Sequence, residues 1–408
     1  MRCKIFNHSI VFIVLVVLSS VCFGQQTENQ IKGVVTDSLT HEPVPYANVY
    51  FANTSIGTST NEKGEYSLSG FADGKYDLTI SSVGFKLTQY PLEFSGTTYN
   101  FSVMLPPEVK TLSSILVKPD TLNWQNNYNE FKRYFIGLTN NAQKVEIENK
   151  KDIHLFFDAS TSTLYAHCKV PLIISNKALG YRLKYQLLSF YLDYKNGATQ
   201  YAGIPLFINV KAKSNLENNK WQKSKEKSYQ GSFTHLINIL YHNKLVSSGF
   251  EIFELHTIRN KERPDEAYLK ERLDYWRKKK MNGGVVVIDK NDSLSYYLSL
   301  KNKPEFIDSV GRQIKSAVEI ISYGKEVYIK SKGRYKVTFK EREELAYAAD
   351  LKRAARNKQE SIVNFLEEKT IIYSNGYYEP ITNVFLSGYL GWSEKIAELL
   401  PLDYTYKK

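Results

Sequence analysis

Residues 31–85 read IKGVVTDSLTHEPVPYANVYFANTSIGTSTNEKGEYSLSGFADGKYDLTISSVGF. Within this stretch, apolar and polar residues alternate in short runs, and turn signals separate the runs every ~8–12 residues. The clearest turn signals are Asn61–Gly64 and Asp73-Gly74. Three apolar residues after the second turn share one face of a strand: Tyr76, Leu78 and Ile80. The stretch therefore predicts a small β-sandwich.

The same residues resemble the carboxypeptidase-regulatory-like family. Its members are transthyretin-like, seven-stranded β-sandwiches that commonly lead Gram-negative envelope proteins. The resemblance covers about a fifth of the chain, and the segments that carry it are Gly33–Asp37, Pro43–Val49, Gly57-Thr58, Asn61–Gly64, Gly74–Tyr76 and Ser82–Phe85. It implies a non-catalytic domain that supplies no active-site residues.

The first 24 residues have the three parts of a secretory signal peptide. Arg2 and Lys4 provide a positive start, and Ile10–Val21 form an apolar run of 12 residues. That run is shorter than the ~20 residues that a permanent transmembrane helix needs. The pattern predicts cleavage between Gly24 and Gln25, and hence an exported protein of the periplasm or the outer-membrane surface. An uncleaved anchor is the alternative.

Cysteine usage agrees with a chain that does not depend on disulfides. Cys3 and Cys22 leave with the signal peptide, so Cys168 alone remains and cannot form an internal disulfide. Its alternation with polar neighbours predicts a buried strand residue and not a nucleophile. Lipidation at Cys22 is a further alternative to simple cleavage, although Val21 fits that signal poorly.

Length and composition predict two or three globular domains. The chain has 408 residues, of which 42% are hydrophobic and 24% charged. Its 30 tyrosines favour β-rich structure. Loss of Arg2 and Lys4 lowers the net charge from +12 to +10. This surplus would suit anionic envelope surfaces or acidic glycans, but lysines spread along the chain would also serve as a solubilising surface. Export argues against nucleic acid as a partner.

The chain is therefore divided into a signal peptide (1–24), a carboxypeptidase-regulatory-like sandwich (25–111), a strand-like linker (112–119) and a larger domain (120–408). Strand-like runs dominate the last part, and at least one helix interrupts them. The predicted fold class is mainly β, with the seven-stranded sandwich followed by a β-rich α+β domain of unknown function.

The linker sequence LSSILVKP resembles a short segment that follows this domain in TonB-dependent outer-membrane receptors. There a plug and a large barrel come next. Only about 290 residues remain here, too few for a plug and a barrel of about 22 strands. Residues 120–408 instead resemble a recurrent envelope family of unknown function, through the segments at 130–142, 171–187, 228–250 and 388–404. This resemblance implies an architecture and no activity.

One helix in the larger domain is well marked. Pro264 suits the first helical position, Asp265-Glu266 suit the first turn, and Gly283-Gly284 would end the helix. Lys278–Lys280 fall in the last turn, where the helix dipole favours cations. An apolar stripe runs along one side: Leu269, Leu273 and Trp276.

Two later segments predict hairpins, and the pattern of a third segment does not distinguish a helix from a hairpin. Residues 318–339 are expected to form a water-exposed hairpin with four cations on one face: Lys330, Lys332, Arg334 and Lys336. Asn375-Gly376 is the strongest two-residue hairpin signal. Glu341–Asn357 fits either a helix or a long hairpin.

Residue patterns that would support metal chemistry are missing. A zinc carboxypeptidase needs a His, a Glu three residues on and a distant second His. None of the histidines after the signal peptide has a Glu at that position: His41, His154, His167, His235, His242 and His256. His235 and His242 lie two helical turns apart, and they are expected to be structural or surface residues and not metal ligands.

Signals for nucleophilic or phosphate chemistry are equally thin. Ser232 precedes His235 without a third partner. Two Ser-x-x-Lys patterns, Ser224-Lys227 and Ser322-Lys325, lack the motifs that accompany them in penicillin-binding enzymes. The loop from Gly70 to Lys75 is one residue short of a phosphate loop and is expected to be a hairpin turn.

The sequence thus predicts a non-enzymatic exported envelope protein with a binding or scaffolding role, and it assigns no catalytic, cofactor-binding or metal residues. Exposed aromatic side chains on a strand face could stack on sugar rings, so carbohydrate is the ligand class to test first. An envelope component or a glycan is the expected partner, peripheral membrane association is compatible, and the oligomeric state is open. The alternatives are an envelope hydrolase with an unrecognised site and a small outer-membrane barrel.

Overall fold

The computed structural model describes residues 28–108, 123–282, 285–286, 292–314, 320–323, 326–330 and 332–406. The signal peptide, its cleavage site at Gly24 and Gln25, and the linker at 112–119 lie outside these residues. Among these described residues, strand residues outnumber helical ones, 41% against 25%. The predicted mainly-β class is therefore confirmed.

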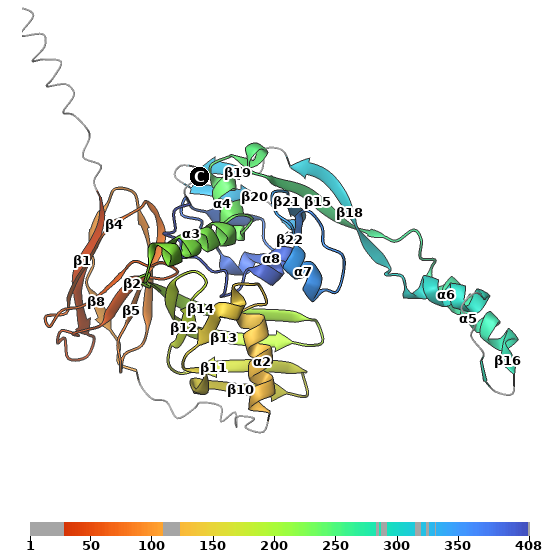
Figure 1. Cartoon of the computed structure of the whole chain (residues 1–408), viewed down its shortest axis with the longest axis horizontal. Coiled ribbons are helices and arrows are strands. Elements are labelled where there is room, and N and C mark those ends of the chain that lie inside the picture. The colour runs from red at the N-terminus through yellow and green to blue at the C-terminus, as the bar shows by residue number, and fades with distance from the viewer. Residues whose placement is uncertain are drawn as a thin grey trace, which may run out of the picture. The chain divides into compact units, whose positions relative to one another are not determined.

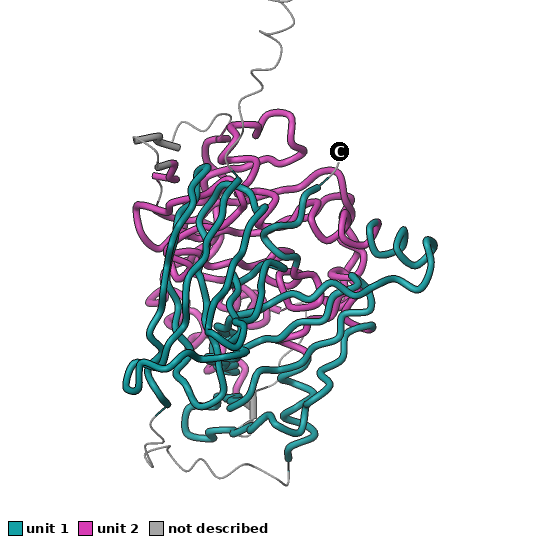
Figure 2. The backbone as a smooth tube through the Cα atoms, turned by 90° about the vertical axis from the view of Figure 1, so that its left-hand side faces the viewer, with its two compact units in different colours: residues 1–132, 144–222, 400–408 teal, residues 133–143, 223–399 magenta. Residues whose placement is uncertain are grey.

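The chain forms two compact units, which are described separately (Figure 2). Unit 1 comprises residues 1–132, 144–222 and 400–408, and unit 2 comprises residues 133–143 and 223–399. The domain boundaries drawn from the sequence stay a prediction.

Unit 1 begins with a β-sandwich of two four-stranded sheets (Figure 1). One sheet contains β4 (Glu65–Phe71), β1 (Asn29–Asp37), β7 (Thr98–Asn100) and β8 (Val103–Leu105). The other contains β3 (Gly57–Ser59), β2 (Asn48–Phe51), β5 (Gly74–Ser81) and β6 (Thr88–Phe94). The predicted inward face of β5 is confirmed, because Tyr76, Leu78 and Ile80 are buried. Four aromatic rings cluster in this core: Phe51, Phe71, Tyr76 and Phe94.

The last strand of the sandwich is split in two. β7 and β8 both run parallel to β1, one after the other, so the predicted seven strands are present with the last one interrupted. At the interruption, a Cβ on Gly33 would lie 2.0 Å from the carbonyl oxygen of Phe101. Only glycine allows this close approach. The Oγ of Ser102 accepts a hydrogen bond from the backbone amide of Val34 at 3.1 Å.

A six-stranded antiparallel sheet forms the rest of unit 1. Its strands are β9 (Val145–Ile147), β10 (Ile153–Asp158), β11 (Thr163–Cys168), β12 (Leu172–Asn176), β13 (Tyr181–Asp193) and β14 (Ala198–Asn209). β13 is 13 residues long and pairs with β11, β12 and β14. Helix α2 (Trp124–Phe135) packs on one face, where the rings of Phe131 and Phe190 lie 4.8 Å apart. Two short 3₁₀ helices flank β9 in the chain: η1 (Ala142–Lys144), whose first two residues belong to unit 2, and η2 (Lys150–Asp152).

Unit 2 is built on two antiparallel sheets. The larger contains β18 (Phe306–Ile314), β15 (Phe250–Arg259), β21 (Gly333–Phe339), β22 (Gln359–Phe365) and β25 (Val384–Ser387). The smaller contains β19 (Ile320–Tyr323), β20 (Glu326–Lys330), β23 (Lys369–Ile372) and β24 (Tyr378–Glu379). Helix α4 (Phe233–Tyr241) contributes Leu236 and Ile237 to the core between them. Helix α3 (Asn215–Tyr229) begins in unit 1 and ends in unit 2, and the other elements of unit 2 outside the helical arm are η3 (Leu245–Ser247), α7 (Leu345–Asp350), η4 (Ile381–Asn383) and α8 (Gly388–Ser393).

A helical arm projects from the larger sheet (Figure 1). β21 pairs with β15 only as far as Leu255, whereas β15 and β18 stay paired up to Arg259 and Phe306. This two-stranded ribbon carries α5 (Glu266–Lys279), β16 (Met281–Asn282), β17 (Val285–Val286) and α6 (Ser293–Asn302). The predicted helix is confirmed as α5, with Leu269 and Leu273 buried. Asp265 is its N-cap, so Pro264 precedes the helix and is not its first residue.

Two sequence-based expectations for unit 2 need correction. Residues 318–339 are not one hairpin, because β20 pairs with β19 and β23, whereas β21 belongs to the larger sheet. Gly333, at φ +127°, stands at the change of sheet, so the cations from Lys330 to Lys336 do not share one hairpin face. The segment Glu341–Asn357, which fits either a helix or a long hairpin by sequence, contains the six-residue helix α7. The Asn375-Gly376 turn is confirmed, but its loop spans residues 373–377 between β23 and β24.

Candidate functional site

Cys168 is a buried structural residue, as predicted. It lies in β11 with 1% of its surface exposed, and its thiol donates to the carbonyl oxygen of Asp152 at 3.3 Å. Burial raises the pKa of this thiol, so the thiolate that would be needed for nucleophilic attack is disfavoured.

His235 and His242 do not form a pair of ligands. His235 lies within α4 beside the rings of Tyr229 and Phe250, and its Nδ1 accepts a hydrogen bond from the amide of Gly231 at 3.2 Å. Burial lowers the pKa of His235 to about 4. His242 instead is the exposed C-cap of α4. Across the described residues, no group of three or more His, Cys, Asp or Glu side chains is placed to hold a metal ion.

The serine and glycine patterns also have structural roles or fall partly outside the described residues. Ser232 is the N-cap of α4, and its Oγ accepts from the amide of His235 at 3.0 Å. Ser224 and Lys227 lie in α3. Ser322 lies in β19, and Lys325 is outside the described residues. The segment from Gly70 to Lys75 joins β4 to β5, which belong to different sheets, so the expected hairpin turn is a crossover instead.

The six-stranded sheet of unit 1 offers a more promising surface on its outer face. Inward-pointing residues of β10, β11 and β13 are buried, among them Leu155, Leu164 and Leu192. Successive side chains of a strand point to opposite faces, so the residues between them point outward. Among these outward residues, aromatic side chains occupy neighbouring positions on three adjacent strands.

We name this set the aromatic row; it consists of Phe156, Tyr165 and Tyr191. Phe156 pairs with Tyr165, and Tyr165 pairs with Tyr191, so the three stand in register across β10, β11 and β13. The rings of Phe156 and Tyr165 are stacked, with centroids 6.4 Å apart and planes inclined by 23°. The hydroxyl of Tyr191 donates to Oε1 of Gln200 on β14 at 2.5 Å. Tyr165 is 41% exposed.

Polar residues lie on both sides of the aromatic row. On one side His154 pairs with His167, and on the other Thr163 pairs with both Asp158 and Asp193. The hydroxyl and amide of Ser160 lower the pKa of Asp158, and the side chain and amide of Asn196 lower that of Asp193. Both carboxylates are therefore charged at neutral pH. The face combines aromatic planes with hydrogen-bonding groups, a combination typical of ligand-binding surfaces.

The sequence predicted the three strands but missed the row itself. The strand-like runs DIHLFFD (152–158), STLYAHCK (162–169) and YQLLSFYLDY (185–194) predict strands where β10, β11 and β13 lie, and alternation fixes which residues share a face within each strand. The register between strands depends on pairing, which the alternation does not encode. Consequently nothing in the sequence placed Phe156, Tyr165 and Tyr191 side by side.

Unit 2 contains a cluster of perturbed titratable groups around the start of α4. Oε1 of Glu394 accepts from the amide of Phe233 at 2.9 Å, and Oε2 of Glu398 accepts from Nδ2 of Asn141 at 2.9 Å and from the hydroxyl of Ser228. Burial raises the pKa of Glu394 to about 7 and lowers the pKa of Lys395. These contacts fasten helices and loops of unit 2, so we assign the cluster a structural role.

The N-terminal sandwich belongs to a recognised class of β-sandwich domain. Residues 31–117 match the family of CarboxypepD_reg-like domains, which confirms the resemblance seen in the sequence. No curated protein matches the chain. In the described part of the chain, no helix combines the length and apolar character needed to cross a bilayer.

Several solved structures are weakly similar to the chain. A DUF3823 family protein from Bacteroides ovatus is 12% identical, with 45% of this chain and 82% of that chain covered, at a TM-score of 0.16. A candidate carbohydrate binding protein from Bacteroides uniformis is 10% identical, with 44% of this chain and 79% of that chain covered, at a TM-score of 0.16. A candidate membrane-associated protein of unknown function from Bacteroides fragilis is 8% identical, with 88% of this chain and 93% of that chain covered, at a TM-score of 0.16. Such low TM-scores assign neither an overall fold nor a function.

Proposed function

We propose that this chain is an exported, non-catalytic protein of the cell envelope that binds carbohydrate on the aromatic row of unit 1. The observation that carries the proposal is the in-register placement of Phe156, Tyr165 and Tyr191 on an exposed sheet face. The signal-peptide pattern and the CarboxypepD_reg-like domain support the envelope location.

The dimensions of the row suit a short stretch of oligosaccharide. Neighbouring strands lie ~4.8 Å apart, so three aromatic side chains cover roughly 10 Å across the sheet. The apolar faces of sugar rings would stack on Phe156 and Tyr165. Sugar hydroxyls would bond to the charged carboxylates of Asp158 and Asp193 and to the imidazoles of His154 and His167.

The charge state of the two carboxylates favours binding over cleavage. A glycoside hydrolase needs one carboxylic acid that remains protonated and donates its proton to the leaving group. Asp158 and Asp193 both have lowered pKa values, so neither is suited to be that acid at neutral pH. This weighs against glycoside hydrolysis by these two carboxylates.

Titration calorimetry of the mature protein against neutral and acidic oligosaccharides tests the proposal. We expect Tyr165→Ala to weaken binding about fivefold or more, because one stacking partner is lost. Tyr194→Ala is the matched control: Tyr194 is 42% exposed, similar to Tyr165, but its ring packs against Phe157 away from the row. The proposal fails if no glycan binds, or if both variants lose the same affinity.

A further inference from the structure

One face of α5 in the helical arm alternates aromatic and cationic side chains. These residues, which we name the arm stripe, are Tyr268, Arg272, Tyr275 and Lys279. Their spacing of four, three and four residues places them above one another on a single helix face. The apolar face that α5 shares with α6 is already buried, since Leu269, Leu273 and Leu294 are at most 1% exposed. The stripe is therefore a second, outward face.

The members of the stripe hold one another in place. The guanidinium of Arg272 lies 5.4 Å from the ring centre of Tyr268, and Nζ of Lys279 lies 4.9 Å from that of Trp276 and 5.9 Å from that of Tyr275. The ring of Tyr268 also lies 6.3 Å from the ring of Tyr297 of α6, measured between their centroids. Tyr268 and Tyr275 nevertheless remain 41% and 51% exposed.

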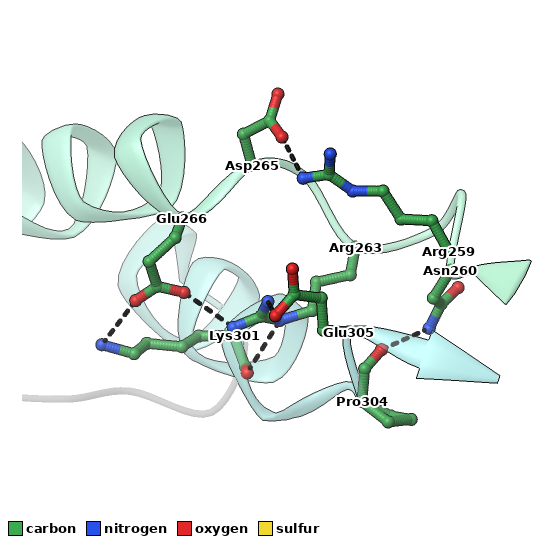
Figure 3. A network of polar contacts seen from close by, with 8 residues as sticks. All are labelled: Arg259, Asn260, Arg263, Asp265, Glu266, Lys301, Pro304 and Glu305. Atoms are coloured by element: carbon green, nitrogen blue, oxygen red, sulfur yellow. Dashed lines mark hydrogen bonds and ion pairs between the residues drawn. The ribbon is translucent and has the colours of Figure 1, made fainter. Parts of the chain in front are cut away.

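Carboxylates near the base of the arm are occupied by neighbouring cations (Figure 3). Arg263 contacts Glu266 at 2.7 Å and Glu305 at 3.9 Å, and Lys301 contacts Glu266 at 3.4 Å. Arg259 and Asp265 form a further ion pair there. These pairs fix the helices to the ribbon and neutralise its acidic groups.

The C-terminal end of α5 keeps a cationic surplus. Asp274 pairs with Arg277 at 3.6 Å, and Lys280 pairs with Asp292. Lys278 and Lys279 are exposed, and among the described residues neither forms an ion pair with a carboxylate. Cations and exposed aromatic rings are thus concentrated at one end of one helix.

We propose that the end of α5 docks the protein on an anionic bilayer surface. Tyrosine and tryptophan place their apolar rings and polar edges at the level of lipid headgroups, and neighbouring lysines are attracted to lipid phosphates. In this arrangement Tyr275 enters the headgroup region, and Lys278 and Lys279 contact phosphate. An acidic soluble polymer would satisfy the lysines without using the exposed tyrosine. This inference rests on unit 2 alone and does not depend on carbohydrate binding by unit 1.

Co-sedimentation of the mature protein with vesicles tests the inference. One set of vesicles contains phosphatidylcholine with about 30% phosphatidylglycerol, and the other contains phosphatidylcholine alone. We expect at least fivefold more bound protein on the anionic vesicles than on the neutral ones. Binding should fall steeply between about 0.1 M and 0.5 M salt. The double variant Tyr275→Ser/Lys279→Glu should drop to the level seen with neutral vesicles.

A matched control separates the arm from general charge effects. Tyr46→Ser/Lys63→Glu makes the same chemical changes at exposed sites of the sandwich, and it should bind like the wild type. The inference is overturned if neutral and anionic vesicles bind equally, or if the arm variant binds like the control. It is also overturned if soluble polyglutamate binds the protein as tightly as the vesicles do.

Discussion

Oε1 of Glu394 accepts a hydrogen bond from the backbone amide of Phe233, the first residue of α4, at 2.9 Å. A helix N-terminus favours a negative charge, and this contact lowers the pKa of the carboxyl group. Burial is the larger effect, and the pKa rises to about 7. The same helix contains His235, whose pKa burial lowers to about 4. Two groups of opposite pH dependence, one in α4 and one bonded to its first residue, thus lie near the start of the same helix.

Glu394→Gln should change how stability depends on pH. Between pH 4.5, the ordinary pKa of a glutamate, and about pH 7, Glu394 keeps a proton in the folded chain that the unfolded chain releases. The free energy of unfolding contributed by Glu394 therefore falls as the pH rises through this range. His235 acts in the opposite direction between about 4 and 6.5, where stability grows as the pH rises. Between pH 4.5 and 6.5 the two effects largely cancel in the wild type.

Removing Glu394 leaves the histidine effect unopposed. We expect the unfolding free energy of Glu394→Gln, measured by urea denaturation, to rise with pH relative to the wild type, by at most about 1.4 kcal/mol per pH unit. Glu62→Gln, in an exposed turn of the sandwich, serves as the surface control. Parallel stability curves for wild type and Glu394→Gln would contradict the raised pKa.

Gly33→Ala should destabilise the sandwich by about 3 kcal/mol, because the new Cβ would overlap the carbonyl of Phe101 and push β7 and β8 away from β1. Gly70→Ala provides the comparison. A Cβ there meets no atom within 4 Å, but the residue has φ +74°, so a cost of about 1 kcal/mol is expected from the backbone alone. Urea unfolding of both variants measures the difference, and equal shifts would refute the steric explanation.

Cys168 should be unreactive in the folded protein. Its burial in β11 and the raised pKa of its thiol both hinder attack on a disulfide reagent. We expect no release of thionitrobenzoate from native mature protein, and one equivalent after unfolding in urea. Rapid reaction under native conditions would show that β11 opens locally.

Exported protein should begin at Gln25, because small residues precede this position after an apolar run. N-terminal sequencing of protein recovered from the periplasm or outer membrane measures this directly. Retention of Ile10–Val21 would indicate an anchor instead of a cleaved signal.

Local features of the fold could be read from the sequence, and long-range ones could not. Alternation identified the buried face of β5, and the run from Asp265 to the lysines identified α5, since both depend on residues close together in the chain. Gly333, however, reads as an ordinary turn residue, while in the structure it redirects the chain from one sheet to another. The aromatic row was missed for the same reason, because it depends on which strands become neighbours.

The pairing of β1 also has a consequence for the order in which the sandwich can form. β1 is the first strand to be synthesised, and it lies between β4 on one side and β7 with β8 on the other. Gln30 meets Thr98, so closing this contact requires a loop of 68 residues (98 − 30). Until β8 has been synthesised, β1 lacks one of its two neighbours. We therefore expect this sheet of the sandwich to close only when its own last strand is available.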